Sequence, residues 1–235
     1  MRLGIMQPYL FPYLGYFQLI NVVDKFIFYD DVNFIKQGWI NRNKILLNGN
    51  EFLFTLPLEK GSSFKLISET EINKKLFENW KIKFNKTLLQ AYCKAPYFET
   101  VHALILDALE IQTLIISDLA CESINLVCDY LGIKTKCVKS SEQDYNNDIL
   151  KASDRVIDIC IKESANDYFN PIGGKELYTK EEFLLKGLEL HFICSRLKPY
   201  KQFDNDHIPS LSIIDVMMFN PKDEILKMLD NYEIV

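Results

Sequence analysis

The hydrophobic pattern over residues 1–47 alternates between strand-like and helix-like segments. An apolar run at 3–6 predicts a short strand, the proline-containing segment 7–13 predicts an extended loop, and 16–23 has the spacing of a short helix. A β-branched and aromatic run at 25–29 predicts a second strand that stops at Asp30-Asp31. Such a unit typically makes two parallel neighbours in a covered sheet, and ligands bind beyond the carboxyl ends of its strands, here beside Gln7, Asp30 and Asp31.

The rest of the chain continues the mixture of helices and strands. Asn48-Gly49 between the runs 44–47 and 51–58 predicts an antiparallel hairpin, because both turn positions tolerate positive φ. Apolar residues recur every fourth position over 76–88 and 120–131, and Gly132 is a natural helix end. Further strands are predicted at 134–138 and 189–195, and helices at 149–160, 211–219 and 223–229. We predict a single α/β domain over residues 1–235, with a mostly parallel sheet, a β-hairpin and a helical insertion at approximately 73–131.

Composition narrows the class of protein. The chain is 48% hydrophobic and 25% charged, as expected of a globular protein, and its net charge of -5 argues against a nucleic-acid-coating role. No segment approaches the roughly 20 apolar residues that a membrane span needs. The apolar run at 3–6 is too short for a signal peptide. We therefore expect a cytoplasmic protein with no membrane span and no nucleic-acid partner.

The cysteines and histidines show few spacings that are typical of a functional site. Six cysteines contain no CxxC pair and no Cys/His spacing typical of zinc sites, so we expect no metal. His102 and His191 are interpreted as structural or solvated. His207 follows Asp206 on a loop ahead of a helix, and a histidine beside a carboxylate can act as a general base near neutral pH. A merely solvated His207 is the alternative interpretation.

Polar and aromatic side chains are concentrated between residues 7 and 43. The run Asn41-Arg42-Asn43 offers a guanidinium and two amides, which suit a phosphate or an array of sugar hydroxyls. The alternative is that Arg42 pairs with Asp30 or Asp31 across the sheet. Because adjacent strand residues point to opposite faces, Asp30 and Asp31 share a pocket only if the strand has already turned, so we expect one to act chemically and one to cap. Ordinary turn chemistry is the alternative for both.

A second candidate region is the glycine-containing segment 169–178. Its two glycines and Lys175 can bring backbone amides and an ammonium group to an anion. The spacing of a P-loop is absent, however, and the pattern favours a plain loop that enters a helix at Lys180.

The longest motifs resemble those of one known family. QPYLFPYLGYF at 7–17, DDV at 30–32, GWINRN at 38–43 and LSIID at 211–215 resemble the WbqC-like proteins of bacterial surface-polysaccharide gene clusters. Members of that family are associated with O-antigen (lipopolysaccharide) and capsule biosynthesis, and a glycine-transferase (aminoacyltransferase) role has been proposed for some. The resemblance implies transfer of an acyl or aminoacyl group to the amine of a deoxyamino sugar carried on a nucleotide.

A weaker similarity concerns the fold. The segment 11–20 is similar to the strand-loop-helix opening of nucleotidylyltransferases and class I synthetases, which implies a Rossmann-like, HUP-like architecture. Tyrosines replace the histidines of that motif, and a tyrosine brings no positive charge to a triphosphate. The similarity therefore implies the architecture without nucleotidyl transfer.

An N-acyltransferase needs a base for the amine and hydrogen-bond donors for the tetrahedral oxyanion. We assign the base to Asp31 or His207, with Asp215 orienting His207 or a helix terminus. The predicted substrate-binding set is Gln7, Tyr9, Tyr13, Asp30, Trp39, Asn41, Arg42, Asn43 and Lys175. In this set Gln7, Asn41 and Asn43 are the donors, Arg42 holds the diphosphate, and Tyr9, Tyr13 and Trp39 stack on base or sugar.

The partners follow from the same hypothesis. We expect no tightly bound cofactor, a nucleotide-linked amino sugar as acceptor, and an acyl donor in the form of a CoA or carrier-protein thioester, so that an acyl carrier protein is a candidate partner. Two other functions remain open. An ATP-dependent ligase that activates its own acid would use the same fold, and a non-catalytic assembly protein of the pathway would need the aromatic loop but not the carboxylates.

Overall fold

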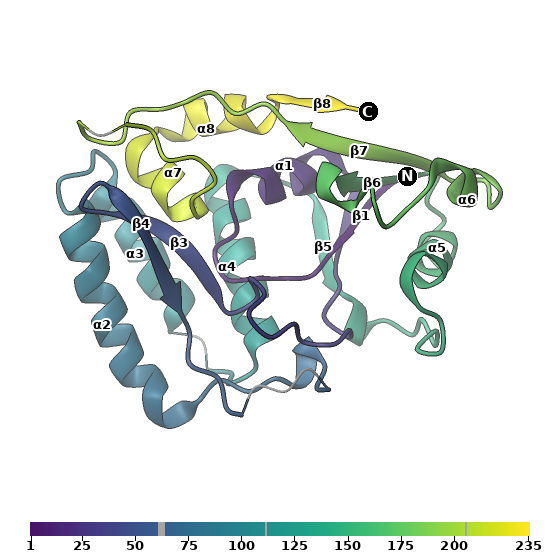
Figure 1. Ribbon diagram of the computed structural model, residues 1–235, viewed down its shortest axis with the longest axis horizontal. Helices are drawn as coiled ribbons and strands as arrows, with labels where there is room; N and C mark the ends of the chain where they lie inside the picture. Colours follow the sequence, from purple (N-terminus) through teal and green to yellow (C-terminus); the bar gives the residue numbers. More distant parts are fainter. Residues whose placement is uncertain (61–63, 111, 205) are drawn as a thin grey trace.

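The computed structural model describes residues 1–60, 64–110, 112–204 and 206–235. Within these residues, six strands form one sheet in the order β5-β2-β1-β6-β7-β8 (Figure 1). All neighbouring pairs are parallel except β7 and β8, which are antiparallel. The strands are β1 Arg2–Met6, β2 Lys25–Phe28, β5 Lys136–Lys139, β6 Asp167–Pro171, β7 Glu189–Ser195 and β8 Tyr232–Ile234. The predicted α/β class with a mostly parallel, Rossmann-like sheet is confirmed.

The order of the strands creates a reversal at the centre of the sheet. From β1 the chain passes through α1 (Leu14–Val22) to β2 and later to β5, all on one side of β1. It then returns to the other side of β1 to form β6 and β7. The strands β1 and β6 are neighbours whose connections leave in opposite directions. In open parallel sheets, this topological switch point is where ligands bind, beyond the carboxyl ends of the strands.

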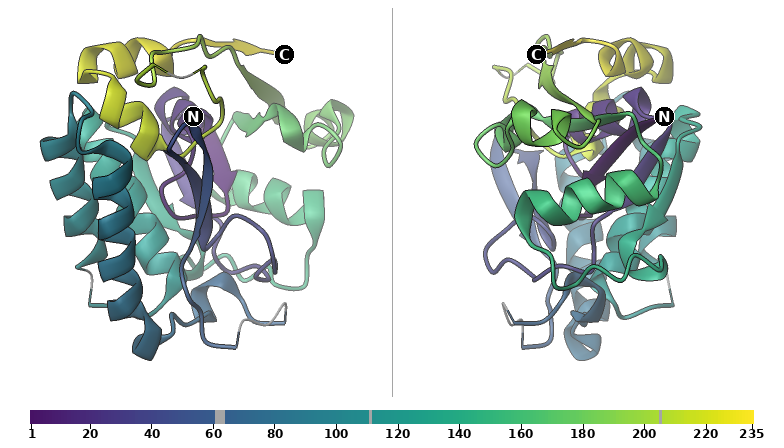
Figure 2. Two further views of the ribbon diagram at one scale, coloured as in Figure 1. Left: turned by 60° about the vertical axis from the view of Figure 1, so that its left-hand side comes forward. Right: turned by 90° about the vertical axis from the view of Figure 1, so that its right-hand side faces the viewer.

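Helices cover both faces of the sheet (Figures 1 and 2). Alternate side chains of β2 divide between the two cores: Phe26 and Phe28 belong to the larger core, which includes α1, whereas Ile27 belongs to the smaller core. The remaining helices of the larger core are α2 Lys74–Tyr92, α3 Phe98–Leu109, α4 Ile116–Leu131, α7 Ile213–Phe219 and α8 Lys222–Leu229. The smaller core contains α5 Ala152–Lys162 and α6 Lys180–Leu184.

The antiparallel hairpin consists of β3 (Arg42–Leu47) and β4 (Asn50–Thr55). Its turn residues Asn48 and Gly49 have φ of 52° and 75°, as the sequence predicts for a two-residue turn. The helices α2 to α4 follow the hairpin and share the larger core with α1. Helix α4 ends at Gly132, whose φ of 79° is the left-handed conformation expected of a glycine cap.

Two strands of the sheet are not predicted by the hydrophobic pattern. Strand β6 occupies the first part of the segment 169–178, which we interpreted as a plain loop, and only the part after Pro171 leaves the sheet. Strand β8 is three residues long and lies at the sheet edge. Pro171 and the glycines that follow it make β6 look like a loop, and β8 is too short for an alternating pattern to be seen.

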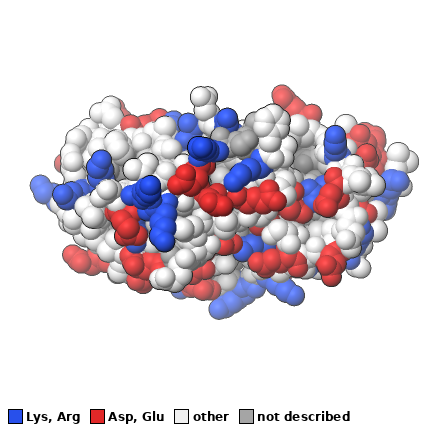
Figure 3. Space-filling model, turned by 90° about the horizontal axis from the view of Figure 1, so that it is seen from below, with Lys and Arg blue, Asp and Glu red and all other residues white. Residues whose placement is uncertain are grey.

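The surface and the helices bear on possible partners. Among the described residues, no helix combines the length and the apolar character that crossing a membrane requires. On the face seen in Figure 3, lysine and arginine side chains are interspersed with aspartate and glutamate side chains rather than gathered into one basic patch.

Candidate binding site at the carboxyl edge of the sheet

A pocket of ≈ 610 Å³ lies at the topological switch point. Met6 ends β1 and Gln7 follows it, while Asn170 lies near the end of β6 and the turn Ile172–Gly174 follows it, so both strands of the reversal contribute to the pocket wall. The segment 35–40 and the end of β7 complete the pocket. Its position is the one that the βαβ unit predicts for a ligand site.

The segment 7–13 forms one wall of the pocket and is held by residues distant in sequence. Phe11 is fully buried with a φ of 45°, an unusual conformation for a non-glycine residue. Its carbonyl oxygen accepts hydrogen bonds from Asn43 Nδ2 at 2.6 Å and from Ser212 Oγ at 2.7 Å. Its N–H donates to Ser123 Oγ at 3.2 Å. These bonds fix the loop conformation, so the pocket wall is built into the fold.

Several aromatic side chains contribute to the pocket walls. Tyr9, Tyr13 and Trp39, which we predicted to stack on a ligand, all line the pocket. A Cβ atom on Gly15 would lie 2.4 Å from the Tyr13 ring, so only glycine lets that ring lie across the start of α1. Burial raises the pKa of both Tyr9 and Tyr13, so both are neutral phenols at neutral pH. Such walls suit a flat base or a sugar face.

None of the described residues that line this pocket carries a charge. Arg42 lies near the rim: its Nε donates to the Gly38 carbonyl oxygen at 2.8 Å, and its guanidinium lies 5.8 Å from the Trp39 ring centre. Lys175 is exposed and follows the lining turn Ile172–Gly174 without lining the pocket itself. A charged ligand group would therefore meet its counter-ions at the mouth of the pocket and not at its base.

The two predicted asparagine donors serve the protein backbone. Asn41 Nδ2 donates to the Leu56 carbonyl oxygen at 2.7 Å, and Asn43 is 4% exposed with its amide hydrogens on the loop carbonyls. Gln7 lines the pocket, whereas Asn41 and Asn43 do not. The geometry favours Gln7 as a substrate donor and gives Asn43 the task of positioning the wall.

Three buried side-chain atoms of the described residues have no hydrogen-bond partner: Gln18 Oε1, Ser195 Oγ and His207 Nδ1. Gln18 and Ser195 line the main pocket. Ser195 and His207 line a neighbouring pocket of ≈ 450 Å³, and Tyr13 lies between the two pockets as a member of both. Buried polar groups are normally paired, so three unpaired atoms in two neighbouring pockets that share Tyr13 and Ser195 indicate a place for a polar ligand.

Gln18 is a functional candidate that sequence reasoning missed. It is fully buried on α1, and its Nε2 donates to the carbonyl oxygens of Met228 and Asn231 at 2.8 and 3.1 Å. Its Oε1 is thereby fixed as an acceptor without a donor. The only signal in the sequence is a polar residue within the mostly apolar run that forms α1.

Asp215 supports His207 through a tyrosine. Its carboxylate accepts hydrogen bonds from Tyr200 Oη at 2.5 Å, Tyr92 Oη at 2.8 Å and Gln202 Nε2 at 2.6 Å. The Tyr200 ring packs edge-on against the His207 ring at a centroid distance of 4.7 Å. Burial raises the pKa of Asp215, although the three hydrogen bonds act to lower it. Asp215 is therefore linked to His207 only through Tyr200, and it also lies in the first turn of α7.

Asp30 and Asp31 lie after the end of β2, where the chain has turned, and both approach Ser140 Oγ, at 3.3 and 2.5 Å. Asp30 is fully buried and accepts hydrogen bonds from the Ser141 N–H at 3.0 Å and Oγ at 2.8 Å. Burial raises the pKa of Asp30, although the Ser141 hydrogen bonds act to lower it. Asp30 thus joins the ends of β2 and β5.

The partner of Asp31 is Arg155 on α5, so the alternative pairing of Arg42 with either aspartate is wrong. One guanidinium nitrogen of Arg155 lies 2.5 Å from Asp31 Oδ2, a second donates to the Asp31 carbonyl oxygen at 3.1 Å, and the guanidinium packs over the Tyr29 ring. Sequence reasoning missed Arg155, because 124 residues separate it from Asp31.

The two candidate bases lie on different flanks of the main pocket. Asp31 lines a polar pocket of ≈ 810 Å³ that shares Tyr29 with the main pocket, whereas His207 lines the pocket that shares Tyr13 and Ser195 with it. Asp31 is engaged with Arg155, whereas His207 Nδ1 is unpaired. Of the two, His207 is the more available to a substrate proton.

Comparison with known proteins supports the motif-based interpretation. The WbqC-like protein family matches residues 7–227, so the chain belongs to the WbqC-like protein family. It is similar to the uncharacterized protein Rv1507c of Mycobacterium tuberculosis (strain ATCC 25618 / H37Rv), with 29% identity over 222 residues, which is 93% of each chain. No solved structure matches the chain.

Proposed function

We propose that this protein transfers an acyl or aminoacyl group to the amine of a nucleotide-linked deoxyamino sugar in the biosynthesis of a surface polysaccharide. The observation that carries the proposal is the aromatic pocket at the switch point, with the unpaired atoms of Gln18, Ser195 and His207 along it. Aromatic walls with a few aimed polar atoms are typical of sites for bases and sugars. Membership of the WbqC-like family supports the pathway. A cytoplasmic location belongs to the proposal, because activated sugars and thioesters are cytoplasmic metabolites.

In the proposed reaction, the sugar amine attacks the carbonyl carbon of a CoA or carrier-protein thioester. A C–N bond forms, the C–S bond breaks, and the thiolate leaves with the proton that the amine releases. His207 accepts that proton through Nδ1 and passes it to the leaving thiolate. Gln18 Oε1 accepts a hydrogen bond from the amine or a neighbouring hydroxyl, and the amide of Gln7 donates to the oxyanion.

The nucleotide occupies the mouth of the pocket in this proposal. Trp39 is 49% exposed there and presents an aromatic face to a base. The guanidinium of Arg42 beside that ring pairs with the diphosphate, and the exposed Lys175, next to the lining turn Ile172–Gly174, adds a second cation. This arrangement keeps the charges of the nucleotide outside the uncharged interior and leaves the amino sugar inside.

A thermal-shift screen tests the proposal. Purified protein is heated with nucleotide-linked amino sugars, free nucleotides, ATP and acyl thioesters, because binding to the folded state alone raises the melting temperature. We expect an amino-sugar nucleotide to stabilise the protein and Arg42→Ala to abolish this effect. Lys44→Ala is the matched control, because Lys44 Nζ lies 5.9 Å from the same Trp39 ring but pairs with Glu51.

Other outcomes of the screen favour the other functions. Stabilisation by ATP alone, accompanied by exchange of pyrophosphate into ATP, would replace the transferase with an acid-activating ligase. No stabilisation by any small molecule would favour a non-catalytic assembly protein. A product assay by mass spectrometry, with the stabilising sugar and a set of thioesters, then identifies the acyl group.

A further inference from the structure

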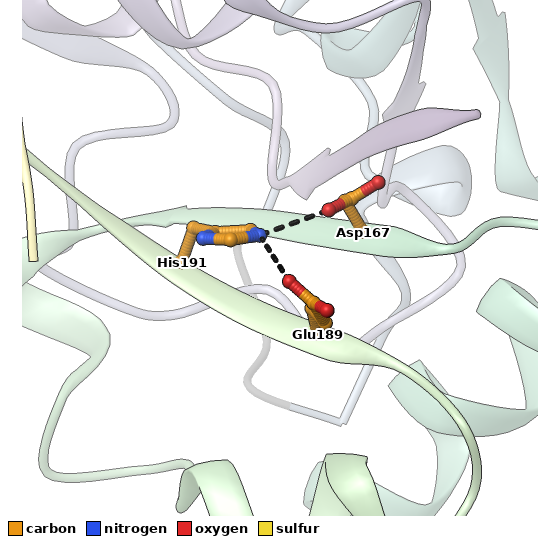
Figure 4. Close-up of side chains that lie close together, drawn as sticks. All are labelled: Asp167, Glu189 and His191. Atoms are coloured by element: carbon orange, nitrogen blue, oxygen red, sulfur yellow. Dashed lines mark hydrogen bonds and ion pairs between the residues drawn. The ribbon is translucent and has the colours of Figure 1, made fainter.

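A cluster of metal-ligating side chains lies away from the pocket, where β6 and β7 begin. Asp167 and Glu189 are the first residues of these strands and are register partners, and His191 follows two residues after Glu189. Residues two apart on a strand point to the same face, so all three side chains lie together (Figure 4). The pocket lies at the other end of the same strands, beside Asn170 and Ser195.

The spacing of the three ligand atoms suits one small cation. His191 Nε2 lies 3.0 Å from Asp167 Oδ1 and 3.7 Å from Glu189 Oε2, and ligand atoms of all three residues lie within 4.8 Å of one another. Zinc bonds to nitrogen and carboxylate oxygen are about 2.0–2.2 Å long, which puts tetrahedral ligands about 3.3–3.6 Å apart. Small side-chain rotations therefore bring the three atoms onto the corners of a tetrahedron.

The packing and the charges around the cluster also favour a metal ion. The His191 ring stacks on Phe169 at a centroid distance of 4.7 Å, which directs Nε2 towards the two carboxylates. Two acidic groups face this one imidazole. Arg2 is a register partner of Asp167, but its guanidinium pairs with Asp24 at 2.7 Å. A divalent ion would balance the two carboxylates of the cluster.

We infer that Asp167, Glu189 and His191 form a binding site for a divalent transition-metal ion of the zinc type. An imidazole with two carboxylates selects zinc, cobalt or nickel over calcium and magnesium, which prefer oxygen ligands alone. Three protein ligands leave one position for water, on the side of Glu189, whose side chain is 71% exposed. The site is independent of the proposed transferase reaction. We expected no metal because we considered only the spacing of cysteines and histidines. That expectation did not consider the Glu189-x-His191 pair.

Cobalt binding tests the inference. The full-length protein is stripped with a chelator and titrated with Co²⁺, while the visible absorption of low-coordinate cobalt and the heat of binding are recorded. We expect one ion per chain, displaced by Zn²⁺ but not by Mg²⁺. His191→Gln and Glu189→Gln should each weaken binding by at least about tenfold, since losing even an outer-sphere partner costs about 10–100-fold.

His102→Gln is the matched control, because His102 lies on α3 and contacts Asn85 instead of carboxylates. Equal Co²⁺ affinity in the wild type and both cluster variants would overturn the inference, as would the absence of binding to the wild type. Glu189 is exposed, so Glu189→Gln keeps the test valid if His191→Gln fails to fold. Circular dichroism verifies the fold of each variant.

Discussion

The two flanks of the main pocket hold their polar groups in opposite ways. On the Asp31 flank, carboxylates, serine hydroxyls and the Arg155 guanidinium satisfy one another. On the His207 flank, Ser195 Oγ and His207 Nδ1 have no partner, although Asp215 behind them is fully hydrogen-bonded. A satisfied network stabilises the fold, whereas unpaired buried atoms are available to a ligand. The difference supports a structural role for the first flank and favours the proposed binding role for the second.

The largest expected effect comes from breaking the Asp31 flank. Arg155 is 7% exposed in its side chain, and Arg155→Met leaves the Asp31 carboxylate without its counter-ion. Removing one partner of a buried ion pair costs about 3–5 kcal/mol, and we expect about 3 because Asp31 keeps its bond to Ser140. Urea unfolding measures the loss. The exposed pair of Arg196 with Glu233 is the control, and Arg196→Met should leave the unfolding midpoint almost unchanged. Equal losses in both variants would contradict the assignment.

On the other flank the expected loss is in catalysis and not in stability. His207→Asn removes the proposed base but no hydrogen bond of Nδ1, so the unfolding midpoint should stay close to that of the wild type. A general base contributes about 10²–10⁴-fold to a rate, and we expect a fall of at least about 100-fold in transfer. Steady-state kinetics with the sugar identified by the screen measure it. An unchanged transfer rate in His207→Asn would show that His207 is not the base.

A matched pair of serine substitutions sharpens the comparison. Ser140 Oγ bonds to both aspartates, so Ser140→Ala should lower the free energy of unfolding by about 1–3 kcal/mol. Ser195 Oγ has no partner, so Ser195→Ala should cost no stability and instead weaken ligand binding. Denaturant titrations and ligand thermal shifts separate the two effects. The reverse ranking of the two stabilities would show that the flanks do not differ.

The smallest effect is a pH dependence at Asp215. Burial raises its pKa, so the folded protein retains this proton to a higher pH than the unfolded chain. Its contribution to stability is complete below the unfolded pKa of about 3.9 and is lost as the pH rises through the folded pKa. The free energy of unfolding of Asp215→Asn, relative to that of the wild type, should therefore increase as the pH rises from about 4.

Asp158 provides the opposite sign in the same experiment. Burial acts to raise its pKa, but hydrogen bonds from Lys162 and Asn147 hold that pKa below its usual value. Its stabilising contribution is present above the unfolded pKa and is lost as the pH falls through the folded pKa. The free energy of unfolding of Asp158→Asn, relative to that of the wild type, should therefore fall as the pH rises. Parallel pH profiles for the two variants would contradict the predicted opposite signs.

The sequence predicted the parts of the fold that depend on local patterns. The first βαβ unit, the Asn48-Gly49 turn and the Gly132 cap follow from periodicity and backbone preference within a few residues. Strand β6 was missed, because its end at Pro171 and the glycines after it look like a loop. Its place in the sheet comes from parallel pairing with β1 and β7, which no local pattern encodes.

The aromatic loop of the candidate site was expected from the sequence, but the pairings of its polar groups were not. The aromatic loop lines the pocket, as the composition of residues 7–43 suggested. Which polar groups face a ligand and which hold the backbone depends on contacts between distant segments, so Arg155 and Gln18 were missed and Asn43 was assigned to substrate. The catalytic and substrate-binding roles, the thioester donor and the carrier-protein partner stay predictions.

The buried loop around Phe11 determines when the protein can first bind a ligand during synthesis. The partners that fix this early segment include Ser123 and Ser212, which lie 112 and 201 residues further along the chain. A nascent chain therefore carries the aromatic side chains from the start but has no pocket until nearly the whole protein has left the ribosome. A ligand therefore stabilises only the completed molecule, and chains truncated before Ser212 gain no stability from it.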